Sequence, residues 1–238
     1  DENDVMDFFE GKDLDCLVLV NPDNPTGNYI SRKGMLKLAR WTKEKNIRFL
    51  ADESFVDFSE EAEPTLLVEE LLDENPHMIV VKSISKSYGI PGLRLGVAAS
   101  GDTDLIGQLK KDVAIWNINS FGEFYMQIEE KYRKDYNSAL DKLRGERTRF
   151  AEKLSKLPGV RVFPSQANYL MVELTGKSIS ATEITELLLT RYNLFIKDLS
   201  SKISRNGRQF LRIAIRNEAE DNILVKALKE ILAQCSKQ

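Results

Sequence analysis

Cysteine and histidine are scarce in this chain of 238 residues, which contains only Cys16, Cys235 and His77. Two cysteines far apart in the sequence form neither a disulfide framework nor a metal site with recognisable ligand spacing. His77 has no serine or cysteine partner by motif, so a hydrolase triad is a poor explanation. Zinc and triad chemistry are thus disfavoured, and low cysteine usage predicts a reducing cytoplasm.

Long apolar runs and a strong net charge are also missing. No run approaches the roughly 20 apolar residues of a membrane helix, and the opening DENDVMDFFEG lacks the pattern of a signal peptide. The net charge is −3 with both signs mixed along the chain, so no basic stripe is present for nucleic acid. We expect neither a membrane nor a nucleic acid as a partner.

The first part of the chain alternates strand-like and helical patterns. Apolar runs at residues 14–20, 47–51, 78–81 and 93–99 predict strands, and the segments between them predict helices, one after the N-cap Ser31 and one from Pro64. A long charged helical stretch covers about 121–156. This order predicts an α/β fold with a mostly parallel sheet flanked by helices.

A second domain is predicted after a boundary near residue 145. Strand-like segments at 160–163, 169–174 and 210–215 are mixed with a helix that opens on the capping box Ser180 and Glu183 and a last helix capped by Asn217 and Glu220. We therefore expect residues 1–145 to form a large domain with an inter-domain helix, and residues 146–238 to form a small α+β domain.

Three polar segments follow three successive predicted strands: NPDNPTG at 21–27, ADESF at 51–55 and SISKSYGIPGLRLG at 83–96. Ligands of open α/β sheets bind at the carboxyl ends of the strands. Serine hydroxyls and an arginine suit a phosphate group, and a lysine among cations, partly removed from water, offers a neutral amine for a Schiff base. Taken singly, each segment is also explained as an ordinary loop.

In combination, the three segments resemble the class I/II aminotransferases of PLP (pyridoxal 5′-phosphate) fold type I, most closely the histidinol-phosphate aminotransferase and threonine-phosphate decarboxylase branch. The resemblance implies that Lys86 forms the Schiff base with PLP and later moves a proton at the substrate α-carbon. It also implies that Asp52 keeps the pyridine nitrogen protonated. The remaining implied cofactor contacts are Asn24 at the ring 3′-oxygen and Ser83, Ser85 and Arg94 at the phosphate.

The resemblance extends into the small domain. Arg212, in FLRI before the last helix, stands where the family carries the arginine that binds the substrate α-carboxylate, although an outward-facing strand arginine is the alternative. Asn168, in ANYL, resembles the segment that faces the substrate. The implied substrates are an amino acid and a 2-oxo acid, in a homodimer.

Two departures from the family pattern stand out. Phe55 occupies a position where many relatives have tyrosine, as in the threonine-phosphate decarboxylase-like branch. The N-terminal stretch of the family, with its glycine-rich phosphate turn and stacking aromatic residue, does not precede Asn21. We therefore expect a truncated or excised piece, with an upstream domain possible, that binds PLP weakly or not at all.

Three functions stay open at this point. The favoured one is PLP-dependent transfer of an amino group between an amino acid and a 2-oxo acid. The first alternative is PLP-dependent decarboxylation of a phosphorylated amino acid, and the second is a truncated or degenerate domain without catalysis. The substrate side chain is not predicted by these residues.

Overall fold

The computed structural model describes residues 1–176, 179–203 and 207–235. Contacts divide the chain into two compact units: unit 1 contains Asp1–Asn24 and Asn28–Ser138, and unit 2 contains Pro25–Gly27 and Ala139–Gln238. This division and the expected boundary near residue 145 both fall within one helix, α7 (Arg133–Ser155). A helix interior carries no loop signal, so local sequence does not mark the division.

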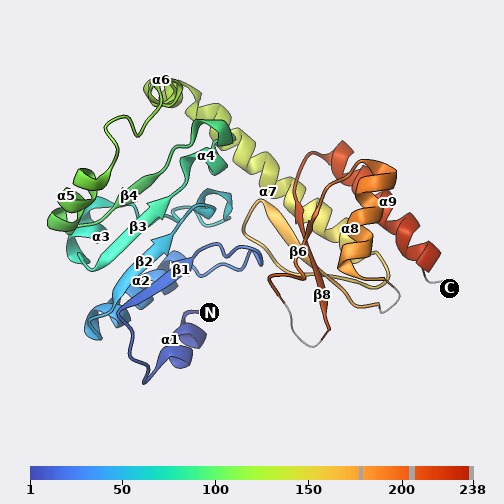
Figure 1. Ribbon diagram of the computed structural model, residues 1–238, viewed down its shortest axis with the longest axis horizontal. Helices are drawn as coiled ribbons and strands as arrows, with labels where there is room; N and C mark the ends of the chain where they lie inside the picture. Colours follow the sequence, from blue (N-terminus) through green and yellow to red (C-terminus); the bar gives the residue numbers. More distant parts are fainter. Residues whose placement is uncertain (177–178, 204–206, 236–238) are drawn as a thin grey trace. The chain divides into compact units, whose positions relative to one another are not determined.

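Unit 1 is built on a four-stranded sheet in the order β1-β2-β3-β4, drawn from blue to green in Figure 1. β1, β2 and β3 are parallel to one another, while β4 runs antiparallel to β3. The mostly parallel α/β arrangement is confirmed. The strands are β1 (Cys16–Val20), β2 (Arg48–Asp52), β3 (Met78–Lys82) and β4 (Val97–Ala99).

The helices of unit 1 lie before, between and after these strands. Ser31 caps α2 as predicted, since its hydroxyl accepts the Gly34 N–H at 3.2 Å. Alternate strand residues point to the same face, and on one face they pack with α2 into an apolar core that includes Leu17, Phe49 and Val80. The helices are α1 (Glu2–Phe9), α2 (Arg32–Glu44), α3 (Glu69–Glu74), α4 (Ile84–Ser87), α5 (Thr103–Asp112) and α6 (Ser120–Ile128).

Two helix predictions need correction. The helix expected from Pro64 begins at Glu69, because the Thr65 hydroxyl and the Leu66 N–H both donate to the buried Glu53 carboxylate, at 2.6 Å each. The long stretch 121–156 is two helices, α6 and α7, separated by a short 3₁₀ segment at 129–132. Periodicity predicted helix at both places, and tertiary contacts set where it starts and stops.

Unit 2 contains a four-stranded antiparallel sheet in the order β5-β6-β8-β7. One face of the sheet packs on α7, α8 and α9 in a core that includes Phe150, Leu170 and Leu211. The capping box predicted for α8 is present, with Ser180 and Glu183 exchanging backbone-to-side-chain hydrogen bonds. The elements are β5 (Val160–Val162), β6 (Tyr169–Leu174), α8 (Ala181–Tyr192), β7 (Lys197–Asp198), β8 (Gln209–Ala214) and α9 (Glu218–Cys235).

Within the described ranges, no helix is both long and apolar enough to cross a membrane. In the same ranges, no group of three or more histidine, cysteine, aspartate or glutamate side chains is arranged to hold a metal ion.

Candidate active site

The three segments singled out in the sequence begin at one edge of the unit 1 sheet. Val20, Asp52 and Val81 lie side by side in the register of the parallel strands, so β1, β2 and β3 end at the same level. The first residues beyond the strands continue this alignment, because the Asn21 N–H donates to the Asp52 carbonyl at 2.9 Å and the Glu53 N–H donates to the Val81 carbonyl at 2.8 Å. The carboxyl edge of the sheet therefore brings the segments together.

Lys86 lies on α4, a turn of helix that follows β3. Its side chain is exposed, and its Nζ atom stands 4.6 Å from the centre of the Phe55 ring, within the range of a cation–π contact. The Ser83 N–H donates to the Ser54 hydroxyl at 3.2 Å, a second link between the same two loops. The lysine is thus held beside the segment that begins with Asp52.

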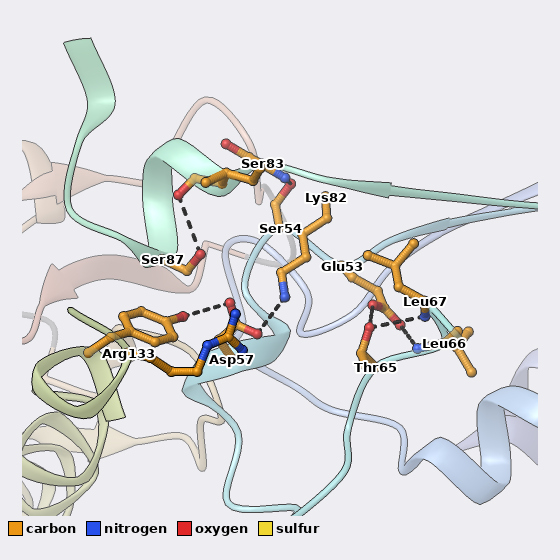
Figure 2. A network of polar contacts seen from close by, with 12 residues as sticks. Glu53, Ser54, Asp57, Thr65, Leu66, Leu67, Lys82, Ser83, Ser87 and Arg133 are labelled. Carbon is orange, nitrogen blue, oxygen red and sulfur yellow. Dashed lines mark hydrogen bonds and ion pairs between the residues drawn. The ribbon is translucent and has the colours of Figure 1, made fainter. Parts of the chain in front are cut away.

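Asp52 is the last residue of β2 and is half-buried. One carboxylate oxygen accepts the Ser54 N–H at 2.8 Å, which turns the chain away from the strand. The next residue, Glu53, is buried, and burial raises the pKa of its carboxyl group. Figure 2 shows Glu53 pointing at Thr65 and Leu66. Two neighbouring acids therefore differ in role: Glu53 fixes a loop, and Asp52 remains at the sheet edge.

The loop from Lys86 to Arg94 is closed by Ser85. The buried Ser85 hydroxyl accepts the Leu95 N–H at 2.7 Å and donates to the Leu95 carbonyl at 3.2 Å. To donate to a phosphate as predicted, this hydroxyl would have to give up its bond to the Leu95 carbonyl, whereas Ser83 is only half-buried. Arg94 is exposed and has φ +56°, a left-handed conformation that costs energy for a residue other than glycine.

Asn24 lies in the loop after β1 and is half-buried. The loop is anchored by Asn21, whose buried side-chain amide donates to the Ile30 carbonyl and accepts the Ile30 N–H, at 2.8 Å each. Asn21 therefore has a structural role, and Asn24 stays the predicted contact to the ring oxygen.

In unit 2, Arg212 lies on β8 opposite Met171 of β6, and its guanidinium stands 5.1 Å from the Tyr169 ring. Asn168 immediately precedes β6, and its carbonyl accepts the Ile215 N–H at 3.0 Å. The buried Arg147 of α7 donates to the Ala167 carbonyl at 3.2 Å and so supports the Asn168 segment. The motifs did not single out Arg147, because only the fold brings its helix to this segment.

Lys197 was also missed by the sequence analysis. It lies on β7 directly opposite Arg212, and it is exposed. Residues directly opposite each other in an antiparallel pair point to the same face of the sheet, and like charges there repel. A second cation beside the predicted carboxylate-binding arginine creates a place that favours an anion. The two-residue strand that carries it has no period that could have indicated the pairing.

The side chains at the unit 1 edge fit PLP by their chemistry. They supply an exposed amine on Lys86, a carboxylate at the end of a parallel strand on Asp52, and a guanidinium on Arg94 in a loop tied by Leu95 to the neighbour of Lys86. These are the groups that a pyridinium aldehyde with a phosphate arm requires. The roles of the individual residues are proposals.

Comparison with known proteins supplies the class. Residues 4–228 match the family described as aminotransferase class I and II. The chain is 36% identical over 239 residues to L-serine phosphate decarboxylase of Sulfurospirillum multivorans, covering 98% of this chain and 59% of that protein. It is 35% identical over 229 residues to CMP-5′-(3-aminopropyl)phosphonate synthase of Streptomyces rubellomurinus, covering 96% of this chain and 36% of that protein.

A solved structure gives the same result. The histidinol-phosphate aminotransferase of Clostridium acetobutylicum matches with a TM-score of 0.84 at 25% identity, covering 97% of this chain and 67% of that one. The chain belongs to the aminotransferase class I and II family, whose members depend on PLP, and the predicted family is confirmed. The chain spans 59% and 36% of the lengths of the two curated relatives.

Proposed function

We propose that this chain carries the lysine loop and the carboxylate-binding strand of a PLP-dependent enzyme that decarboxylates a phosphorylated amino acid. The observation that carries the proposal is the pair Arg212 and Lys197, two cations on directly opposite positions of β8 and β7. Two cations suit a substrate with two anionic groups, a carboxylate and a phosphate. The similarity to an L-serine phosphate decarboxylase supports the same substrate class.

Each predicted site residue has a separate role in this proposal. The bound cofactor supplies an electron sink for the α-carbon of the substrate. Asp52 would hold the proton on the ring nitrogen, Asn24 would donate to the ring oxygen, and Ser83 and Arg94 would bind the phosphate arm. Lys86 would hold the cofactor, and its amine would deliver to the substrate α-carbon the proton that replaces the carboxylate lost as carbon dioxide.

The choice of reaction depends on orientation. The two candidate reactions differ in which group leaves the substrate α-carbon, the carboxylate or a proton, so the residues that bind the substrate anions influence the choice. Arg212 and Lys197 would therefore decide whether the carboxylate or the proton is lost. Amino transfer to a 2-oxo acid, which the sequence analysis favoured, is the second candidate. It is supported by the similarity to a histidinol-phosphate aminotransferase.

The test measures both products. The chain is incubated with PLP and L-serine phosphate, with and without 2-oxoglutarate, and carbon dioxide and L-glutamate are quantified. We expect carbon dioxide without any requirement for the 2-oxo acid, and none from Lys86→Ala. Glutamate as the main product would favour amino transfer. Bound PLP with neither product would favour a domain without catalysis.

A variant of Lys197 tests whether this residue binds the substrate phosphate, with unphosphorylated L-serine as the control substrate. Lys197→Gln should raise KM for L-serine phosphate by about ten- to a hundredfold, because a charge-assisted hydrogen bond contributes roughly 1.5–3 kcal/mol. With unphosphorylated L-serine, the same variant should give the same rate as the parent. An equal loss for both substrates would contradict the assignment of Lys197 to the phosphate.

PLP binding by this chain is a separate question. We propose that the chain takes PLP at Lys86, in a homodimer of the kind usual in the family. Borohydride reduction after adding PLP, followed by mass spectrometry, reports a covalent adduct on Lys86. An adduct on other lysines and none on Lys86 would contradict the assignment.

A further inference from the structure

Asp57 is a half-buried acid that the proposed chemistry leaves unused. It lies in the 3₁₀ turn Val56–Phe58, directly after the segment of Asp52 and Phe55. One carboxylate oxygen accepts from Lys82 Nζ at 2.6 Å, and the other accepts from the Tyr136 hydroxyl at 2.7 Å. The side chains of Asp57 and Lys82 are each only 15% exposed, so the pair is largely removed from water. Figure 2 shows Lys82 reaching down to Asp57.

The two partners of Asp57 lead to the two ends of the turn that carries Lys86. Lys82 is the last residue of β3 and stands immediately before the N-cap of α4. Tyr88 is the residue directly after α4, and its ring stacks on Tyr136 with centroids 4.2 Å apart and planes 2° from parallel. Asp57 therefore holds one end through Lys82 and the other through Tyr136 and Tyr88. We call these four residues the Asp57 network.

The turn needs such support. α4 has four residues, and a helix of that length is not stable without tertiary contacts. Its N-cap, Ser83, makes no side-chain capping hydrogen bond. Burial, together with the charge of Asp57, raises the pKa of Tyr136 well above its ordinary value, so the phenol keeps the proton that it donates.

We propose that Asp57 is a positioning residue for Lys86: through Lys82 on one side and Tyr136 with Tyr88 on the other, it fixes the helical turn from which the lysine reaches the cofactor. The inference rests on the proposed function for the importance of Lys86. The geometry itself concerns only unit 1. Asp57 contacts no reacting atom in this assignment and acts through the backbone of residues 82–88.

The first experiment measures hydrogen exchange in the protein without cofactor. Asp57→Asn keeps the size of the side chain and an oxygen for Tyr136 but leaves the Lys82 charge unpaired. We expect amides of residues 83–88 to exchange about tenfold faster or more, since local opening is governed by local contacts. Asp141→Asn, which breaks the exposed ion pair with Arg144, is the matched control and should leave these amides unchanged.

A second variant guards against global unfolding. Tyr136→Phe keeps the ring stacked on Tyr88 and removes only the hydroxyl, so it should fold and show a smaller increase confined to residues 83–88. If both variants leave these amides as in the parent, or speed exchange equally throughout unit 1, the positioning role is overturned.

A double-mutant cycle tests the link between Asp57 and Lys82. Lys82→Gln and Asp57→Asn should each slow the capture of PLP at Lys86, measured as adduct formed over time after borohydride reduction. Together they should be no worse than the more damaging single change, because the pair acts as one unit. Effects that multiply would contradict the network. Neither readout uses decarboxylation, so these results stand or fall separately from the proposed reaction.

Discussion

The two sheets of this chain differ in how completely they are buried. All six residues of β6 in unit 2 are buried, whereas Val18 in the middle of β1 is 60% exposed and β4 has no buried residue. Parallel strands are usually covered on both faces, yet the unit 1 core packs on one face. The Lys86 loop thus belongs to the less buried sheet. Its conformation therefore depends more on individual side-chain contacts, such as those of Asp57.

The largest effect on stability is expected at Gly27, which belongs to unit 2 although the residues on either side of 25–27 belong to unit 1. Gly27 follows β1 but has φ +74°, and a Cβ built there would meet the Ser165 Oγ at 2.1 Å and the Ser165 Cα at 3.1 Å. Gly27→Ala should lower the free energy of unfolding by about 2–5 kcal/mol, from backbone strain and overpacking together. Hydrogen exchange should locate the loss in β6 rather than in β2.

Gly11→Ala separates the two causes. Gly11 has a similar φ of +72°, with nothing within 4 Å of the added Cβ. The substitution should therefore lower the free energy of unfolding by about 1 kcal/mol, from backbone strain alone. Equal losses at Gly27 and Gly11 would mean that the contact with Ser165 is not tight, and that residues 25–27 are not part of the unit 2 core.

A smaller effect is expected from one substitution made in both sheets. Val172→Thr places a hydroxyl in the core of unit 2, where burial without a partner costs about 1–3 kcal/mol. Val18→Thr in β1 should change stability by less than about 0.5 kcal/mol, because the side chain faces solvent. Denaturant unfolding of both variants measures the difference, and comparable losses would show that the exposed face of β1 is covered in solution.

The last effect depends on pH and concerns Asp221 in the first turn of α9. One of its carboxylate oxygens is buried without a hydrogen-bond partner among the described residues, and burial raises its pKa from 3.8 to about 6. The folded chain then binds this proton more tightly than the unfolded chain, so the stability it provides is lost as pH rises through about 6.

Asp221→Asn removes that loss. The Tm of the variant relative to the parent should rise between pH 4 and pH 8, as followed by circular dichroism. Asp104→Asn, in the first turn of α5 and exposed, is the control and should show no such trend. A difference in Tm that stays constant with pH would contradict the raised pKa of Asp221.

Much of the fold was predictable because its signals are local. The caps at Ser31 and Ser180 depend on residues three positions away, and most strand positions follow from short apolar runs. The apolar run 93–99 is an exception, since it is a strand only from Val97. The positions of the helix starts at Glu69 and Arg133 were not predictable, since the Leu66 N–H is taken by a carboxylate from another loop and Tyr136 is held by Asp57.

The sequence by itself determined the family, the α/β plan and the order of the polar loops, since each depends on short segments of neighbouring residues. Only the tertiary structure decided that Asp57 meets Lys82 and Tyr136, that Ser85 bonds Leu95, and that Lys197 faces Arg212. These pairs join residues from different elements. Strand register and the packing of loops bring them together, and no spacing along the chain encodes either.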